Sequence, residues 1–242
     1  MKTALCMSGQ PRFYREGFSY MFDFVLEGLD PDCFSHVWYD PSNAGGSYSK
    51  SDHASDCVVE KGTIEDLREM YYEEVRHEPE RNPFYPKPSD QHFRQEPGCP
   101  IDIQFSMFYG MMQSISMMKD SGEDYDLVIR SRYDYAPMSH LPDEIDGDKL
   151  YFCDFIPPRD GTHVLCDYMM FGSKDVMVEV GDTFNHIPEY HNSGTKMCGE
   201  EMLMRHMREC GIQTVPVPAY GILVRDGELN NTNFGKPSPK RI

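Results

Sequence analysis

Short apolar runs alternate along the chain with segments in which apolar residues recur every three or four positions. The runs are typical of buried strands, and the recurring pattern is typical of helices that bury one face. Strands are predicted at 3–7, 34–39, 57–60, 127–129, 150–153, 168–172 and 212–217, and helices at 11–29, 63–71, 101–119, 176–184 and 199–210. This alternation over the whole length predicts an α/β fold, with a mostly parallel sheet covered by helices on both faces.

A chain of 242 residues can bury one large core, and neither an internal repeat nor a clear domain boundary interrupts the pattern. We therefore expect a single domain over 1–242. The segment at about 77–100 is rich in Pro, Asn, Gln and charged residues, so it is not expected to form a regular element. A loop of this length inside a domain is either functional, here as a lid or an acceptor-binding loop, or a passive surface insertion.

The predicted central strand at 127–129 is followed by three charged residues, Arg130, Arg132 and Asp134. Side chains alternate along an extended chain, so Arg130, Arg132 and, if the chain stays extended, Asp134 are expected on one side of the sheet's edge. Ligands of open α/β sheets bind beyond the carboxyl ends of strands. Two guanidinium groups and a carboxylate suit a phosphate with a divalent metal, and structural salt bridges are the alternative. The pair Asp124 and Asp126 precedes the strand and is expected at the opposite edge.

A tight turn with the sequence Ser8-Gly9-Gln10-Pro11-Arg12 follows the first predicted strand. Pro11 suits the first position of the helix that comes next. A turn between a strand and a helix presents backbone N–H groups and a helix N-terminus to an anion, and Arg12 would add positive charge. An ordinary turn is the alternative, because Ser and Gly are common in turns of every function.

The formal net charge of −17 argues against nucleic acid and anionic membranes as partners, because both require a basic surface. Eight cysteines occur without any Cys-x-x-Cys pair, which favours free thiols in a reducing compartment. The sequence begins directly with a strand pattern, and no apolar segment approaches the length that spans a membrane. We expect a cytoplasmic protein with no integral membrane segment.

Four short motifs occur in an order and spacing that resemble one group of enzymes: Ser8-Gly9-Gln10-x-Arg12, Arg130-x-Arg132-x-Asp134, a strand at 167–172 and the acidic helix start Glu200-Glu201. The group is the nucleotide-sugar glycosyltransferases of the GT-A type. More narrowly, the chain resembles a small microbial and viral family that carries Arg-x-Arg-x-Asp in place of the usual Asp-x-Asp. The resemblance implies a GT-A-like, Rossmann-related fold and transfer of a hexosyl or related group from a nucleoside diphosphate to a glycan or other hydroxyl acceptor.

The resemblance also implies roles for single residues. Donor binding falls to Ser8, Gly9, Gln10 and Arg12, and Arg130 and Arg132 either share that task or lock the strand end by ion pairs. Asp134 is implied to hold Mn²⁺ or Mg²⁺ that bridges the diphosphate, since hard cations take carboxylate and phosphate oxygens. A carboxylate near the acceptor is implied as general base, with Asp167, Glu200 and Glu201 as candidates.

The three candidate bases differ in their expected positions. Asp167 begins a predicted strand and is expected away from the ligand, unless the preceding loop folds back over the site. Glu200 and Glu201 open a helix, and helix starts face the same edge as strand ends in a doubly wound sheet. Glu200 shares the inward stripe of Leu203 and Met207, whereas Glu201 is rotated by about 100°. Glu200 is therefore favoured, although acids at a helix start also stabilise it without any function.

Two departures from the usual pattern leave metal dependence open. Arg132 stands where a second carboxylate is common, and no histidine follows His206, where many such enzymes have a late metal ligand. The other candidates for that ligand are the predicted loop histidines His163, His186 and His191. Two other function classes also stay open: a catalytically silent nucleotide- or glycan-binding module, and an unrelated α/β phosphate enzyme, which would want the Lys and glycines of a phosphate loop.

Overall fold

A seven-stranded sheet forms the centre of the computed structural model, which describes residues 1–46, 57–71, 74–78, 101–153, 165–217, 221–225 and 228–229. Its strands, in spatial order, are β3 (Glu74–Glu78), β2 (Asp32–Trp38), β1 (Thr3–Gly9), β4 (Leu127–Ser131), β7 (Met169–Gly172), β6 (Lys149–Cys153) and β8 (Gln213–Val217). Within these residues β7 runs antiparallel to both of its neighbours, and the other pairs are parallel. The predicted α/β class with a mostly parallel sheet is confirmed.

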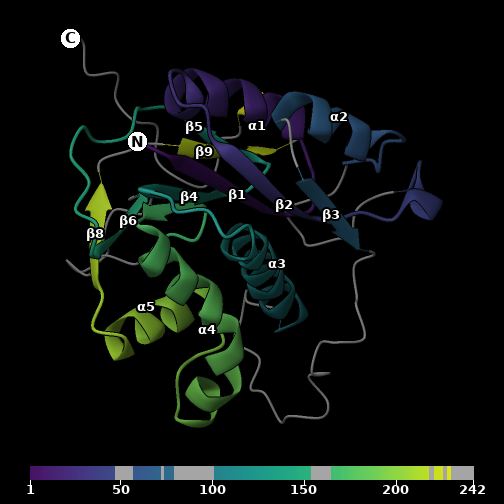
Figure 1. Cartoon of the computed structure of the whole chain (residues 1–242). Coiled ribbons are helices and arrows are strands. Elements are labelled where there is room, and N and C mark those ends of the chain that lie inside the picture. Colours follow the sequence, from purple (N-terminus) through teal and green to yellow (C-terminus); the bar gives the residue numbers. More distant parts are fainter. Residues whose placement is uncertain are drawn as a thin grey trace.

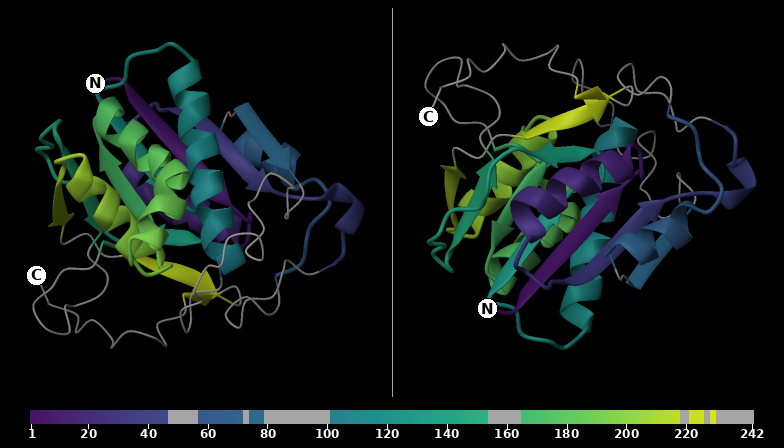
Figure 2. Two further views of the ribbon diagram at one scale, coloured as in Figure 1. Left: turned by 90° about the horizontal axis from the view of Figure 1, so that it is seen from below. Right: turned by 90° about the horizontal axis from the view of Figure 1, so that it is seen from above.

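Helices cover both faces of the sheet (Figure 1). On one face lie α1 (Tyr14–Met21), which continues into a π-helical turn (Phe22–Leu26), and α2 (Thr63–Tyr71). On the other lie α3 (Ile101–Asp120), α4 (Lys174–Asn192) and α5 (Gly199–Glu209). Figure 2 shows the two faces in turn. Side chains of β1 alternate between two apolar cores, because Ala4 and Cys6 pack on the side of α3 to α5, and Leu5 and Met7 pack on the side of α1 and α2.

A small antiparallel sheet lies beside α1 (Figure 1). It consists of β5 (Tyr135–Pro137), β9 (Gly221–Arg225) and β10 (Glu228–Leu229). Strand β9 was not predicted from the sequence, and it pairs with the segment that follows the Arg-x-Arg-x-Asp motif. Neither partner has a long apolar run, and short strands of this kind leave little periodicity in a sequence.

The third strand of the sheet is β3, and the strand predicted at 57–60 is wrong. That segment forms only an isolated bridge, in which Val59 exchanges backbone hydrogen bonds with Gly45 and Gly46. β3 carries four charged or titratable residues among five, as an edge strand can, and so lacks the apolar run by which strands are recognised. Its last two residues open the loop predicted at 77–100, and residues 79–100 lie outside the described part of the chain, as does 154–164.

The first helix begins at Tyr14 and not at Pro11. Phe13 precedes it in the left-handed conformation, with φ 48°, so Arg12 belongs to the loop between β1 and α1. A short 3-10 turn (Pro41–Asn43) follows β2. In the part of the chain that the structure describes, no helix combines the length and the apolar character needed to cross a bilayer.

Gly17 allows α1 to lie directly against the backbone that follows β4. A Cβ at this position would overlap the carbonyl oxygen of Tyr133 and come within 3.4 Å of the carbonyl oxygen of Tyr135. Backbone atoms cannot swing aside as a flexible side chain can. The glycine therefore fixes the approach of α1 to the turn that contains Asp134.

We expect Gly17→Ala to lower the free energy of unfolding by about 1 to 3 kcal/mol, because the methyl group overpacks this contact. The direction is diagnostic, since Ala favours a helix over Gly by about 1 kcal/mol where nothing clashes. Urea denaturation measures the change. Gly147→Ala is the control: a Cβ there meets its nearest neighbour, Ser173 Cβ, at 3.9 Å, and should alter stability by less than about 0.5 kcal/mol. Equal effects of the two substitutions would contradict the contact.

Candidate functional site

The candidate site lies at the edge of the sheet where β1, β2 and β4 end. β7 also reaches this edge with its beginning, because it runs antiparallel and Met169 pairs with Ser131, the last residue of β4. Asp167 and Tyr168 precede β7 and therefore lie at the site. The structure places Asp167 at this edge and not at the opposite one, because β7 runs antiparallel to β4, and an apolar run does not encode strand direction.

Arg130 is a buried cation whose direct hydrogen-bond partners are uncharged. Its side chain is 1% exposed and donates to Ser8 Oγ (3.2 Å) and to the backbone carbonyl of Asp167. Among the described residues it forms no ion pair, and its Nε has no hydrogen-bond partner. Burial lowers the pKa of Arg130 to about 10. The negative charge of Asp167 opposes this shift, but no carboxylate is bonded directly to Arg130, and a buried charge without such a partner is costly.

Asp134 is held by two other guanidinium groups. β4 ends at Ser131 and the chain then turns, so the condition that it stays extended as far as Asp134 is not met. Arg132 Nε lies 2.8 Å from Asp134 Oδ1 and its Nη2 lies 2.9 Å from Oδ2, while Arg12 Nη2 lies 3.4 Å from Oδ2. Burial opposes the charge of Arg132, but the carboxylate of Asp134 outweighs it and raises the pKa of Arg132.

The arginines thus gather at one point of the edge. Arg12 is 9% exposed and comes from the loop after β1, and Arg132 is partly buried, with its guanidinium 5.4 Å from the centre of the Tyr168 ring. Arg130 lies two residues before Arg132, on the α3 face of β4. Three guanidinium groups therefore meet at this corner, where Asp134 pairs with Arg12 and Arg132 and the negative charge of Asp167 lies near Arg130 and Arg132.

The described residues around Asp134 do not fit a divalent metal. Both carboxylate oxygens already accept from guanidinium groups, so an ion on either oxygen would face two positive charges at close range. Over the described ranges, only Glu179, His206 and Cys210 form a group of three potential metal ligands, and they lie on α4 and α5. The Mn²⁺ or Mg²⁺ that the resemblance implies at Asp134 is therefore not assigned a role in the proposed transfer reaction.

The start of α5 brings two carboxylates together. A Cβ at Gly199 would lie 3.6 Å from Asp167 Oδ2, so the first turn of the helix packs on Asp167. Glu200 is half-buried beside it, and burial, followed by the negative charge of Asp167, raises the pKa of Glu200. Cys198 Sγ donates to Glu200 Oε2 at 2.7 Å. Glu201 points elsewhere and pairs with Lys196 at 3.2 Å in solvent.

The turn after β1 supplies the remaining predicted donor-binding residues. Ser8 is buried and accepts the hydrogen bond from Arg130. Gly9 has φ 123°, a conformation that favours glycine, and ends the strand abruptly. The backbone N–H of Arg12 then donates to the Gln10 carbonyl at 2.8 Å, which closes a tight turn at the sheet edge.

A group of hydrogen-bonded side chains around His36, beside Ser8, was not predicted from the sequence. His36 pairs in register with Ser8, is fully buried, and its Nε2 lies 3.2 Å from Glu78 Oε1. Tyr109 OH donates to the same oxygen at 3.4 Å. Burial lowers the pKa of His36, which favours the neutral ring. The alternation of Phe34, His36 and Trp38 along β2 is the signal that places a polar ring on the α3 face at the strand end.

The other candidate positions lie away from this edge or outside the described chain. Asp126 accepts from the backbone N–H of Lys2 at 2.7 Å, at the opposite edge of the sheet, as expected. His186 and His191 lie on α4, where His186 pairs with Asp182 at 3.1 Å. His163 lies outside the described residues.

A scan against models of protein families finds no match for the sequence, and a search of the curated proteins finds no related sequence.

Proposed function

We propose that the chain is a GT-A-type glycosyltransferase that moves a sugar from a nucleoside diphosphate to a hydroxyl group of a glycan or other acceptor. One observation carries the proposal: Arg130 is buried at the edge of the sheet where β1, β2 and β4 end, with uncharged direct partners, next to Arg12 and Arg132. A diphosphate would give Arg130 an anionic hydrogen-bond partner, which its direct contacts do not include, and guanidinium groups bind phosphate oxygens by paired, charge-assisted hydrogen bonds.

The arginines would act on the leaving group. In the transfer, the bond between the anomeric carbon and a diphosphate oxygen breaks, and the electron pair stays on the diphosphate. Arg130 and Arg132 stabilise the negative charge that develops there, and they do so from positions fixed by burial for Arg130 and by Asp134 for Arg132. Asp134 keeps the forked side chain of Arg132 in place through two hydrogen bonds.

Glu200 would act on the acceptor. The acceptor oxygen forms the new bond to the anomeric carbon and releases its proton to the carboxylate of Glu200. A carboxylate whose pKa is raised by burial and by Asp167 takes a proton more readily than one in solvent. Glu201 pairs with Lys196 in solvent and has no part in this step.

A second candidate function is a binding module that holds a nucleotide or glycan without transfer. It is favoured by the geometry of Asp134, which already pairs with both Arg12 and Arg132. In that case Arg130 alone would attract the phosphate, and the ion pairs of the other arginines would be structural.

Thermal-shift measurements with UDP-, GDP-, CMP- and dTDP-sugars separate the possibilities. We expect one nucleotide class to raise the melting temperature, since a ligand at 100 times its Kd stabilises by about 2.7 kcal/mol. The shift should be the same with and without saturating Mn²⁺ or Mg²⁺, because guanidinium groups supply the positive charge.

Release of the free nucleoside diphosphate is then measured with glycan acceptors. Release that depends on acceptor supports transfer, whereas binding without release supports the binding module. A chain whose melting temperature responds to no nucleotide would contradict both functions. A shift that appears only with Mn²⁺ would restore Asp134 as a metal ligand.

A further inference from the structure

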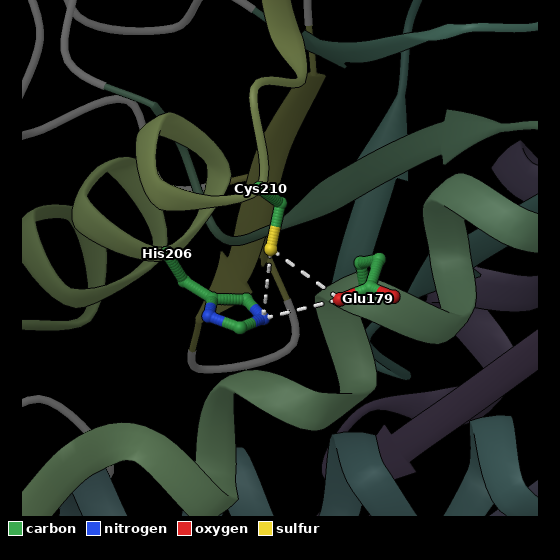
Figure 3. Close-up of side chains that lie close together, drawn as sticks. All are labelled: Glu179, His206 and Cys210. Atoms are coloured by element: carbon green, nitrogen blue, oxygen red, sulfur yellow. Dashed lines mark hydrogen bonds and ion pairs between the residues drawn. The ribbon is translucent and has the colours of Figure 1, made fainter.

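A second group of chemically reactive side chains lies between α4 and the end of α5. Glu179 comes from α4, His206 from the last turns of α5, and Cys210 directly follows that helix. Cys210 Sγ lies 3.4 Å from Glu179 Oε2 and 3.7 Å from His206 Nε2, and His206 Nε2 lies 3.7 Å from Glu179 Oε2. Figure 3 shows the three side chains converging on one point.

These separations suit one small tetrahedral ion. Zinc binds sulfur at about 2.3 Å and nitrogen or oxygen at about 2.0 to 2.2 Å, which sets ligand atoms of a tetrahedral site roughly 3.3 to 3.7 Å apart. His206 and Cys210 are four residues apart at the end of α5, so they face the same way. α4 supplies the third ligand atom at matching distances without any rearrangement of the backbone.

The ring of His206 is already oriented for such a role. It is 2% exposed, and its Nδ1 lies 2.8 Å from the hydroxyl of Tyr190, which is also buried. The partner of Nδ1 fixes the ring and leaves Nε2 toward Glu179 and Cys210, as outer hydrogen bonds do for metal-binding imidazoles. The ring of His186 stacks on the ring of His206, and the two ring centroids are 4.9 Å apart.

We propose that Glu179, His206 and Cys210 bind a zinc ion, with water in the fourth position. A thiolate with an imidazole selects zinc over magnesium or calcium, which prefer oxygen ligands. Cys210 is exposed, so the ion and the water reach the site directly from solvent. The ion ties the end of α5 to α4, and α5 carries Glu200 at its other end. This site is independent of the proposed transfer reaction.

The test uses cobalt as a spectroscopic substitute for zinc in the full chain after treatment with a chelator. We expect one Co²⁺ per chain with the near-ultraviolet absorption of a thiolate-to-cobalt bond, and its displacement by Zn²⁺. Zn²⁺ should also raise the melting temperature of the wild type, because an ion that binds only the folded chain stabilises it.

Cys210→Ser and Glu179→Gln carry the test, because both side chains are accessible and neither substitution opens a cavity. We expect Cys210→Ser to abolish the thiolate absorption and both variants to weaken Zn²⁺ binding by at least about 10- to 100-fold. Cys57→Ser, a partly buried cysteine elsewhere, is the control and should keep both properties. Undiminished absorption in Cys210→Ser, or a melting temperature of the wild type that ignores Zn²⁺, would show an ordinary hydrogen-bonded cluster and overturn the proposal.

Discussion

Replacing Glu200 by Gln is expected to lower turnover by about 10²- to 10⁴-fold, because the amide cannot take the acceptor's proton. Donor affinity should stay within about twofold, since the donor's diphosphate lies against the arginines and not against α5. Steady-state kinetics gives the turnover, and calorimetry gives the affinity. Glu201→Gln is the matched control, because Glu201 lies one residue along the same helix and pairs with Lys196 in solvent.

The same substitution should stabilise the chain at neutral pH. Burial and Asp167 raise the pKa of Glu200 above its ordinary value of about 4.3, so folding favours the protonated carboxyl. Stability from this group is present at low pH and is lost as pH rises through the raised pKa. Glu200→Gln should therefore have a higher melting temperature than the wild type at pH 7, and the difference should vanish near pH 4. A variant that is inactive but no more stable than the wild type would contradict the buried-carboxylate account.

A different pattern of activities would move the base to another residue. If Asp167→Asn or Glu201→Gln shows the large loss while Glu200→Gln stays active, the assignment of Glu200 is wrong. Asp167 is the serious rival, because it lies 8% exposed at the same edge, next to the start of α5.

Arg130→Met is expected to weaken nucleotide binding by roughly 30- to 1000-fold, or about 2 to 4 kcal/mol. Methionine fills a similar volume but carries no charge and donates no hydrogen bond. Stability should change by less than about 1 kcal/mol or rise, because the substitution removes a buried charge that lacks a direct ion pair within the described chain. Calorimetry with the nucleotide and urea denaturation measure the two effects.

Arg15→Met is the control for loss of an arginine. Arg15 is half-exposed and pairs with Glu60 and Asp66 on the outer side of α1. Its loss should leave nucleotide affinity unchanged and alter stability by at most about 1 kcal/mol. If Arg130→Met binds the nucleotide as tightly as the wild type does, Arg130 has a structural role only.

Much of the fold follows from the hydrophobic pattern. The cores of β1, β2, β4, β6 and β7 were predicted because central strands are apolar on both faces, and the edge strand β8 was predicted from its short apolar run. β3, β5 and β9 were missed for the opposite reason: β3 is an edge strand with charged side chains, and β5 and β9 pair in a small separate sheet. Their partners are distant in sequence, so local composition holds no sign of the pairing.

The candidate site also contains some residues that the sequence could place and others that it could not. Arg130 and Ser8 could be placed from the sequence, because each ends a strand and such ends meet at one edge. Asp167 lies at the site because β7 runs antiparallel to its neighbours. That direction depends on how the connecting segments cross the sheet, and the residues of β7 themselves do not show it. The turn at Arg132 to Asp134 closes a bidentate ion pair, and the sequence does not show where β4 ends and this turn begins.

The group formed by Glu179, His206 and Cys210 was missed because only two of its three residues are close in the sequence. His206 and Cys210 have helical spacing, but Glu179 comes from another helix, and the pairing of α4 with α5 is a tertiary contact. The His36 and Glu78 pair has the same character, since it joins β2 to an edge strand that was not predicted.

A crystal structure of the chain with a bound nucleoside diphosphate is the most direct measurement of the central claim. The account predicts diphosphate oxygens at about 2.7 to 2.9 Å from guanidinium nitrogens of Arg130 and Arg132, with the sugar side of the ligand toward Glu200. A diphosphate bound at another surface, with Arg130 in contact only with Ser8 and the Asp167 carbonyl, would contradict it.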